Sequence, residues 1–196
     1  MTVKDVVELS AVFLQLEDVL STSEFSSSIN ANSNSVVEVN DLTTRNLNLL
    51  IRCTDLVLKE VATDFIPIRK KEIILTNEKE IEFSSFSSPV LKIIDVKQNG
   101  KSIKYKIFST HIELSKSGEI EVIYNAIPST VKTLGANIDE VSNLVSQRIL
   151  AYGVAKEYCY ISSLYDEATM WEEKFKNAIS SITKSVSKRV KARRWF

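Results

Sequence analysis

The chain has 196 residues with 25 basic and 25 acidic side chains, so its formal net charge is zero. This length is that of one domain or two small lobes, and the composition, 44% hydrophobic and 26% charged, is typical of a globular protein. The sequence contains only two cysteines, Cys53 and Cys159, and one histidine, His111. This inventory argues against zinc, iron–sulfur and thiol-redox chemistry.

The N-terminal third of the sequence predicts two helices. Apolar residues recur at steps of three and four from Val6 to Leu20, which indicates an amphipathic first helix. A second helix is expected over residues 42–65, because Asp41 is suited to cap its first turn and Pro67 disfavours helical geometry at the residue before it. Its expected apolar face carries Leu49, Cys53 and Leu56, with Leu50, Val57 and Val61 beside them.

Residues 21–36, between these two helices, are dominated by Ser and Asn and show no periodicity. Such a segment buries too little apolar surface to offset its conformational entropy, so a flexible loop is expected there. We expect this loop to order in part when the protein assembles, because a polar segment beside acidic helices is placed for coupled folding and binding.

The middle of the chain, residues 68–127, changes to short runs that are rich in β-branched and aromatic residues. Six strands are expected, in the segments KEIILT, KEIEFSSF, VLKIIDVKQ, KSIKYKIFS, HIELS and EIEVIYNAI. Asn99-Gly100 is a strong signal for a two-residue hairpin turn, and Ser117-Gly118 is a weaker one. Alternation of apolar and charged residues predicts a small antiparallel sheet or sandwich with a solvated outer face.

Two further helices are expected after Pro128. Asn137 and Glu140 have the spacing of a capping box at the start of the third helix, and Asp166 is expected to cap the fourth. Almost no loop separates the two helices, which favours a tight αα-hairpin. Their apolar stripes contain Leu144, Ala151, Val154, Tyr158, Ile161 and Tyr165 in the third helix, and Ala168, Trp171, Phe175, Ala178, Ile182 and Val186 in the fourth.

The predicted fold class is therefore α+β, a helical bundle of about four helices with an inserted small antiparallel β-sheet or sandwich. Residues 1–65 and 129–196 form the expected helical core, residues 66–128 the β insertion, and residues 187–196 a basic C-terminal tail. The two helix pairs are expected to pack together, because each helix has an apolar stripe that needs a partner.

The zero net charge conceals a strong asymmetry along the chain. The net charge is −6 over residues 1–65, +3 over 66–136, −5 over 137–173 and +8 over 174–196, where eight basic residues occur without an acidic one. An acidic body with a basic tail is typical of a protein that binds something acidic, either nucleic acid or the acidic surface of another subunit. Part of the basic cluster has a local explanation, because basic residues favour the negative end of a helix dipole.

No catalytic, cofactor or metal site emerges from the residues. The four glycines are too far apart for a phosphate-binding loop. His111 lies in a predicted strand without a neighbouring nucleophile motif, and Cys53 and Cys159 fall among apolar helix positions, where a thiol behaves as a small hydrophobic group. We expect no cofactor and no enzyme activity, and an enzyme that uses Cys159 or His111 is the least favoured alternative.

Four segments and the C-terminus, taken in order, carry a resemblance to a known family. They are LVLKEVATDFIPI (residues 56–68), VLKIIDVKQNGKSIKY (90–105), SGEIEVIYNAIP (117–128), AYGVAKEYCYISSLYDEATMWEEKFKNAI (151–179) and the closing KARRWF. From residue 56 onward, the chain resembles the head-to-tail connector (portal adaptor) proteins of tailed bacteriophages. The N-terminal helix and the Ser/Asn loop match that family only in kind.

The resemblance implies a structural virion protein without a chemical step, made in the cytoplasm of the bacterial host and located in the neck between portal and tail. It implies a ring, expected to contain twelve copies, that lies below the portal, extends the DNA channel and docks neck, stopper or tail components. The expected partners are other copies of the chain, the portal protein, a neck or tail protein, and DNA that passes through the channel without sequence recognition. No membrane partner is expected, because no apolar run reaches the roughly 18 residues of a membrane helix.

In such a ring two different faces of one subunit meet, and opposite charges on these faces set the register of neighbours. The acidic first helices and the acidic third helix are expected to meet the basic fourth helix of the next copy. The tail is expected to dock in a groove of the portal, with aromatic anchors and arginines paired to carboxylates. The docking residues are Arg193, Arg194, Trp195 and Phe196.

Two alternatives remain open for the basic C-terminal residues. A basic face formed by Lys184, Lys188, Arg189 and Lys191 points into the channel near DNA, or lies at the subunit interface. A hypothesis from a different class is a free-standing nucleic-acid-binding protein that acts through residues 174–196, with an affinity that falls steeply with salt.

Overall fold

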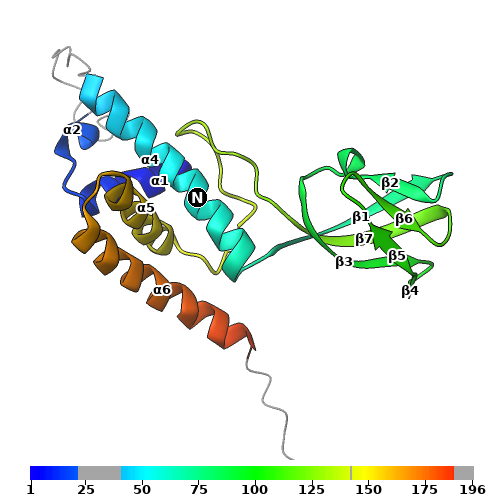
Figure 1. Ribbon diagram of the computed structural model, residues 1–196. Helices are drawn as coiled ribbons and strands as arrows, with labels where there is room; N and C mark the ends of the chain where they lie inside the picture. The colour runs from blue at the N-terminus through cyan, green and yellow to red at the C-terminus, as the bar shows by residue number, and fades with distance from the viewer. Residues whose placement is uncertain (22–40, 142, 188–196) are drawn as a thin grey trace, which may run out of the picture. The chain divides into compact units, whose positions relative to one another are not determined.

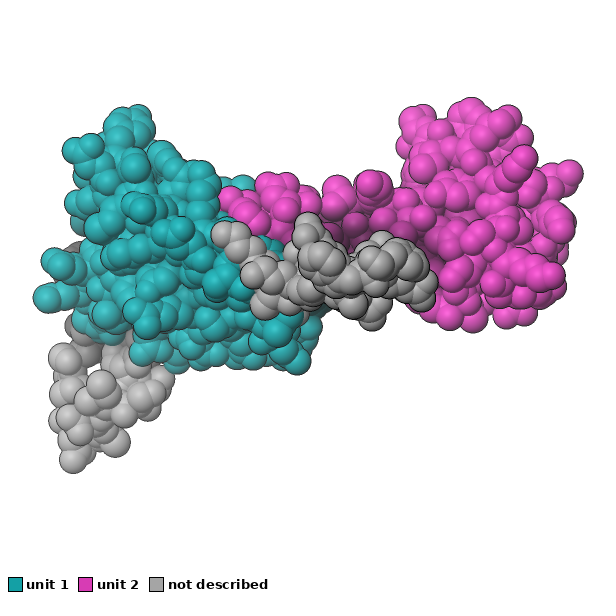
Figure 2. Space-filling view, turned by 90° about the horizontal axis from the view of Figure 1, so that it is seen from below, with its two compact units in different colours: residues 1–58, 130–196 teal, residues 59–129 magenta. Residues whose placement is uncertain are grey.

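The protein is described by a computed structural model that covers residues 1–21, 41–141 and 143–187, so the expected loop at residues 21–36 lies outside the described residues apart from Ser21. The chain divides into two compact units, a helical unit of residues 1–58 and 130–196 and a β unit of residues 59–129 (Figure 2). The sequence predicts these boundaries after residues 65 and 128. The predicted α+β fold class is confirmed, because helices build one unit and the described strands all lie in the other.

Five α-helices lie among the described residues (Figure 1). They are α1 (Val3–Phe13), α2 (Glu17–Leu20), α4 (Asp41–Glu60), α5 (Gln147–Ile161) and α6 (Tyr165–Ser187). The single helix predicted near the N-terminus is broken, because Gln15 adopts a φ of 55° between α1 and α2. At the start of α1, the amide of Asp5 donates to the Thr2 hydroxyl over 3.3 Å, and the amide of Thr2 donates to the Asp5 carboxylate over 2.8 Å. This reciprocal capping box fixes where α1 begins.

The buried face of α4 differs from the predicted one. Leu50, Cys53 and Val57 are fully buried, whereas Leu56 is 48% exposed. Apolar residues occur on both sides of α4, so periodicity alone does not identify the side that faces the core. Packing against the other helices of the unit determines which face of α4 is buried.

The starts of α5 and α6 also differ from the prediction. Ser146 is the N-cap of α5, and Asn137 instead forms an isolated antiparallel bridge with Thr2, so the predicted capping box at Asn137 is wrong. Since α6 begins at Tyr165, Asp166 lies inside its first turn and is not the cap. The tight connection between the two helices is confirmed, because α5 ends at Ile161 and α6 begins at Tyr165, and Ser163 between them has a positive φ of 63°.

The helical unit is built around α5, which lies between α4 and α6 (Figure 1). A Cβ atom at Gly153 of α5 would lie 2.6 Å from Cγ1 of Val57 in α4 and 3.1 Å from Cε2 of Phe175 in α6. Glycine therefore permits both neighbours to approach the same turn of α5. A stack of three aromatic rings joins α1, α5 and α6 and consists of Phe13, Tyr152 and Trp171.

The β unit contains two antiparallel sheets, with strand orders β1–β7–β3–β4 and β2–β6–β5. A π-helical turn at Val61–Phe65 precedes Pro67 and the first strand. The strands are β1 (Ile68–Thr76), β2 (Glu80–Glu82), β3 (Val90–Gln98), β4 (Lys101–Ser102), β5 (Tyr105–Ile107), β6 (His111–Leu114) and β7 (Gly118–Ala126). Both sheets contribute to one core, which includes Ile81, Ile93, Ile112, Ile120 and Tyr124.

The two turn predictions have opposite outcomes. Asn99 and Gly100 have φ angles of 51° and 76° and join β3 to β4, as a type I′ hairpin requires. Gly118 also has a positive φ, of 123°, but β6 and β7 lie in different sheets, so the hairpin predicted at Ser117-Gly118 is wrong. The segment KSIKYKIFS, predicted as one strand, contributes to both sheets, because β4 pairs with β3 while β5 pairs with β6.

A buried tyrosine and a carboxylate connect the core of the β unit to its surface. Tyr124 is fully buried, and its hydroxyl donates a hydrogen bond to Glu72, which also accepts one from the Ser87 hydroxyl. Burial acts to raise the pKa of Glu72, but the hydrogen bonds from Ser87 and Tyr124 outweigh it and hold this pKa below its ordinary value.

We expect the β unit to lose stability in acid through Glu72. A carboxyl group whose pKa is lower in the folded than in the unfolded chain stabilises the fold at pH values above the unfolded pKa, here about 4.5. That stabilisation is lost as the pH falls through the lower native pKa. Urea unfolding of the wild type and of Glu72→Gln between about pH 3 and pH 6 measures this. A wild-type stability that falls no faster than that of the variant would contradict the assignment.

Candidate functional site

Most residues of the predicted docking site lie outside the described residues. These are Lys188, Arg189 and Lys191 of the basic face, and Arg193, Arg194, Trp195 and Phe196 of the tail. Lys184 belongs to the helical backbone of α6. The candidate surfaces below belong to the described parts of the two units.

The side chains with the most reactive groups, two thiols and one imidazole, are divided between the two units. Burial raises the pKa of the Cys53 thiol to about 12 and that of the Cys159 thiol to about 11, so both thiols stay protonated near neutral pH and lack the nucleophilic thiolate form. His111 lies in the other unit, where its ring stacks on Phe108 with centroids 4.8 Å apart. Within the described ranges, no group of three or more His, Cys, Asp or Glu side chains is arranged to hold a metal ion. Nor does any helix there have the length and apolar character to cross a membrane.

The outward face of α4 carries a stripe of alternating leucine and arginine residues, which we call the α4 stripe. Its members follow steps of three and four residues and so lie on one face of the helix. Leu42 is 62% exposed and Leu56 is 48% exposed, and Leu49 between them is half-buried. The full stripe consists of Leu42, Arg45, Leu49, Arg52 and Leu56.

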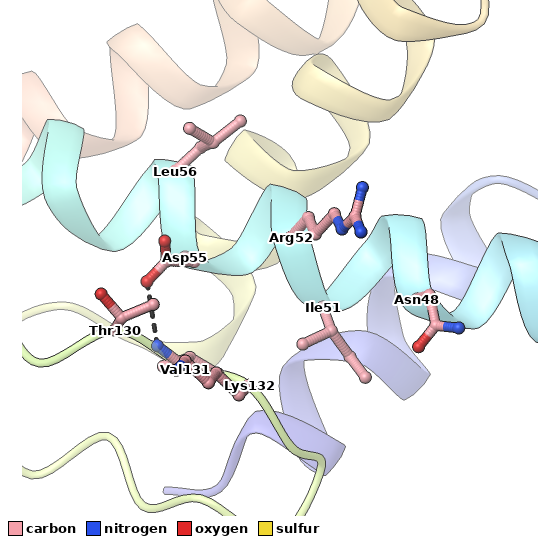
Figure 3. Close-up of a pocket in the computed structure, with 8 residues that line it drawn as sticks. All are labelled: Asn48, Ile51, Arg52, Asp55, Leu56, Thr130, Val131 and Lys132. Atoms are coloured by element: carbon pink, nitrogen blue, oxygen red, sulfur yellow. Dashed lines mark hydrogen bonds between the residues drawn. The ribbon is translucent and has the colours of Figure 1, made fainter.

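Two open hollows flank the α4 stripe. One lies between α4 and residues 130–132, and Arg52 and Leu56 project from the same side of α4 in its close-up (Figure 3). The wall of this hollow formed by residues 130–132 is held against α4 by Asp55, whose carboxylate accepts a hydrogen bond of 2.9 Å from the amide of Val131. The second hollow lies between α4 and the end of α5, and its lining is Thr44, Arg45, Asn48, Leu49, Arg52 and Ile161. Both hollows are open to solvent and can accept side chains of a partner.

A second surface gathers exposed apolar side chains where α5 turns into α6, and we call it the α5–α6 corner. Exposed apolar area bordered by polar groups is typical of protein contacts, and single exposed side chains are not. Acidic side chains accompany the apolar ones here, since Asp166, Glu167 and Glu173 are all exposed. The exposed apolar residues are Ile161 (51%), Leu164 (45%), Tyr165 (64%) and Met170 (44%).

The β unit also exposes apolar side chains, and the two most exposed ones lie on strand β1. Ile73 and Leu75 of β1 are 60% and 77% exposed, and β1 is an edge strand of its sheet. The ion pair between Lys71 and Glu121, with Nζ and Oε2 2.8 Å apart, lies on β1 and β7. Exposed edges of this kind are able to pair with other chains, although charged side chains reduce that tendency.

Sequence reasoning missed the α4 stripe because it assigned Leu49 and Leu56 to the core. A usable signal was present, since leucines occur every seven residues at positions 42, 49 and 56 and arginines occur every seven residues between them, at 45 and 52. A fully buried helix face does not accept arginines at this spacing without partners. The α5–α6 corner was missed for a similar reason, because Ile161 and Tyr165 match the periodicity of a buried stripe.

Comparison of the sequence with models of known protein families and with curated proteins found no match. We therefore infer function from the exposed surfaces of the helical unit and from the resemblance carried by residues 56–196.

Proposed function

We propose that the protein is a structural subunit of a homo-oligomeric ring that connects the portal of a tailed bacteriophage to its neck or tail. The observation that carries this proposal is the presence of two surfaces on the helical unit, the α4 stripe and the α5–α6 corner, where exposed apolar side chains lie among charged ones. The two surfaces border each other at the hollow that Ile161 lines. Such surfaces suit protein–protein contacts, which combine apolar anchors with a polar rim. The order of the segments from residue 56 onward supports the connector family in particular.

A ring needs two different faces on each subunit. In a heterologous contact, one face of a copy meets the other face of the next copy, and a rotation that closes gives a ring. The two surfaces of the helical unit supply such a pair. The β unit and the C-terminal residues then remain available for the portal below the capsid and for the neck or tail component.

We expect removal of residues 187–196 to abolish binding to the portal protein. The aromatic and arginine residues of this tail are of the types that dominate binding energy, and a single anchor contributes about 2 kcal/mol or more, which is roughly a 30-fold change in dissociation constant. Native mass spectrometry of the full-length chain mixed with its cognate portal protein measures this, with Trp195→Ala as the single-residue variant. The full chain is expected to load onto the portal as a ring.

Two outcomes of this experiment would overturn the proposal. One is a full-length chain that stays monomeric and unbound in the presence of the portal protein. The other is strong DNA binding by the isolated subunit that falls steeply with salt and disappears with residues 187–196, which is the behaviour of a free-standing nucleic-acid-binding protein.

A further inference from the structure

The α4 stripe and the outer face of α6 have matching spacings and opposite charges. Arg45, Leu49 and Arg52 follow one another at steps of four and three residues in α4. Asp166, Met170 and Glu173 follow one another at the same steps in α6. Two arginines and two carboxylates are thus each separated by about 10.5 Å along their helix, at 1.5 Å per residue, with one apolar side chain between them.

The charged members of both triplets and Met170 are accessible to another molecule, and Leu49 is half-buried. Arg45, Arg52, Asp166 and Glu173 are exposed, and Met170 is 44% exposed. Other charges on α6 are already engaged: Lys176 pairs with Glu172 at 2.6 Å, and Lys174 lies 4.1 Å from the centroid of the Trp171 ring. The two acids of the triplet have no ion-pair partner among the described residues. Asp166 also favours the positive end of the α6 dipole, but that effect does not extend to Glu173, two turns further on.

The two triplets of one chain cannot meet each other, because α5 lies between α4 and α6 (Figure 1). The approach of Val57 and Phe175 to Gly153 from α4 and α6 places both helices against α5. In Figure 1, α4 and α6 also run in the same direction on the two sides of α5. A neighbouring copy related by a small rotation therefore brings its α6 beside α4 in the parallel sense.

We propose that α4 of one copy packs in parallel along α6 of the next copy, with Arg45 opposite Asp166, Leu49 opposite Met170 and Arg52 opposite Glu173. The parallel direction follows from the spacing, because both triplets have the step of four first, whereas an antiparallel pair would place Leu49 and Met170 one residue out of register. This contact would be the interface between neighbouring subunits, so the proposal rests on the proposed ring assembly. The net charges of the sequence segments predict acidic N-terminal helices against a basic last helix. In the proposed contact the signs are reversed, because α4 supplies the basic side chains and the first half of α6 supplies the acidic ones.

A second copy fits the α4 stripe better than nucleic acid does. Three of the five stripe residues are leucines, and apolar side chains gain nothing from a phosphate backbone. The hollows beside the stripe can receive exposed side chains of the next copy, such as Leu164 and Tyr165, which adjoin its acidic triplet. Opposite charges at matching intervals fix the register of the two helices, while the apolar side chains between them supply buried area.

Charge reversal tests the proposed pairing directly. Sedimentation velocity at high protein concentration, with and without the cognate portal protein, is used to follow assembly of the full-length chain. We expect Arg45→Glu/Arg52→Glu and Asp166→Lys/Glu173→Lys each to raise the dissociation constant for self-association by at least about tenfold per pair, because like charges then face each other. The matched controls, Lys92→Glu/Lys101→Glu and Glu8→Lys/Glu78→Lys, change the same number of exposed charges elsewhere and are expected to assemble normally.

An equal mixture of the two reversed variants is expected to regain assembly. The acidic α4 of the first variant then faces the basic α6 of the second, and the basic α4 of the second faces the acidic α6 of the first. Every contact of an alternating ring is thus complementary again. A variant that lost assembly through misfolding would not recover in this way, so recovery separates the interface from a folding defect.

Oxidative cross-linking tests the register. Leu49→Cys combined with Met170→Cys in one chain is expected to give a ladder of disulfide-linked oligomers, whereas Leu49→Cys combined with Glu8→Cys is expected to give none. Assembly that continues in both reversed variants, or a ring without the Leu49→Cys/Met170→Cys ladder, would overturn this interface and leave the ring proposal standing. A wild-type chain that never assembles, even with the portal, would instead overturn the ring proposal.

Discussion

Replacement of Gly153 with alanine is expected to destabilise the helical unit by about 1–3 kcal/mol. In an exposed helix the same change normally stabilises by about 1 kcal/mol, so the sign here is decided by packing and not by helix propensity. The added methyl group would lie 2.6 Å from Val57 Cγ1. Valine is branched at Cβ and has few rotamers, so it cannot move aside cheaply, and the helices must separate instead.

Urea unfolding followed by tryptophan fluorescence measures this effect. Gly135→Ala is the matched control, because a Cβ at Gly135 meets no atom within 4 Å and is expected to change stability by less than about 0.5 kcal/mol. In the double variant Gly153→Ala/Val57→Ala, the smaller side chain makes room for the new methyl group. The double variant is therefore expected to be more stable than the sum of its single changes predicts. A Gly153→Ala variant that is more stable than the wild type would show that the helices are not in this close contact.

Replacement of Tyr124 with alanine is expected to destabilise the β unit by about 3–5 kcal/mol and leave the helical unit folded. Tyr124 is fully buried in the core shared by the two sheets, where its ring packs edge-on against Phe86 with centroids 5.0 Å apart. Its removal leaves a cavity that the strands around it cannot fill. Tyr124→Phe keeps the ring and loses only the hydrogen bond to Glu72, so its expected cost is about 1 kcal/mol.

Two probes distinguish the units in this experiment. Trp171 is buried in the helical unit, so its fluorescence reports that unit, while far-UV circular dichroism reports both units. Thermal unfolding of Tyr124→Ala is expected to show an early loss of circular dichroism without a matching change in fluorescence. Coincident transitions by both probes would contradict independent unfolding of the two units.

These core substitutions complement the charge reversals at the proposed interface. Gly153 and Tyr124 act through packing, so their replacement lowers the stability of the isolated subunit. Arg45, Arg52 and Glu173 are exposed, and changes at such positions usually alter stability by less than about 0.5 kcal/mol. Loss of assembly without loss of stability is therefore the specific signature of the proposed contact between α4 and α6.

The features that the sequence predicted correctly depend on neighbouring residues. The Asn99-Gly100 hairpin follows from two adjacent residues that both tolerate positive φ, and the end of the helical segment before Pro67 follows from local sterics. The α5–α6 hairpin follows from two apolar stripes with almost no sequence between them. The same local patterns were enough to predict the α+β class, because the hydrophobic period changes from helical to alternating and back along the chain.

The sequence by itself determined the order of helical and strand segments and the turn at Asn99-Gly100, since these depend on interactions within a few residues. The tertiary structure alone decided which sheet each strand joins, as in the separation of β4 from β5, and which side of α4 is buried. It also decided that α5 lies between α4, which carries Arg45, and α6, which carries Asp166 (Figure 1). Such outcomes depend on contacts between residues that are far apart in the chain, and the local pattern of apolar residues is compatible with more than one of them.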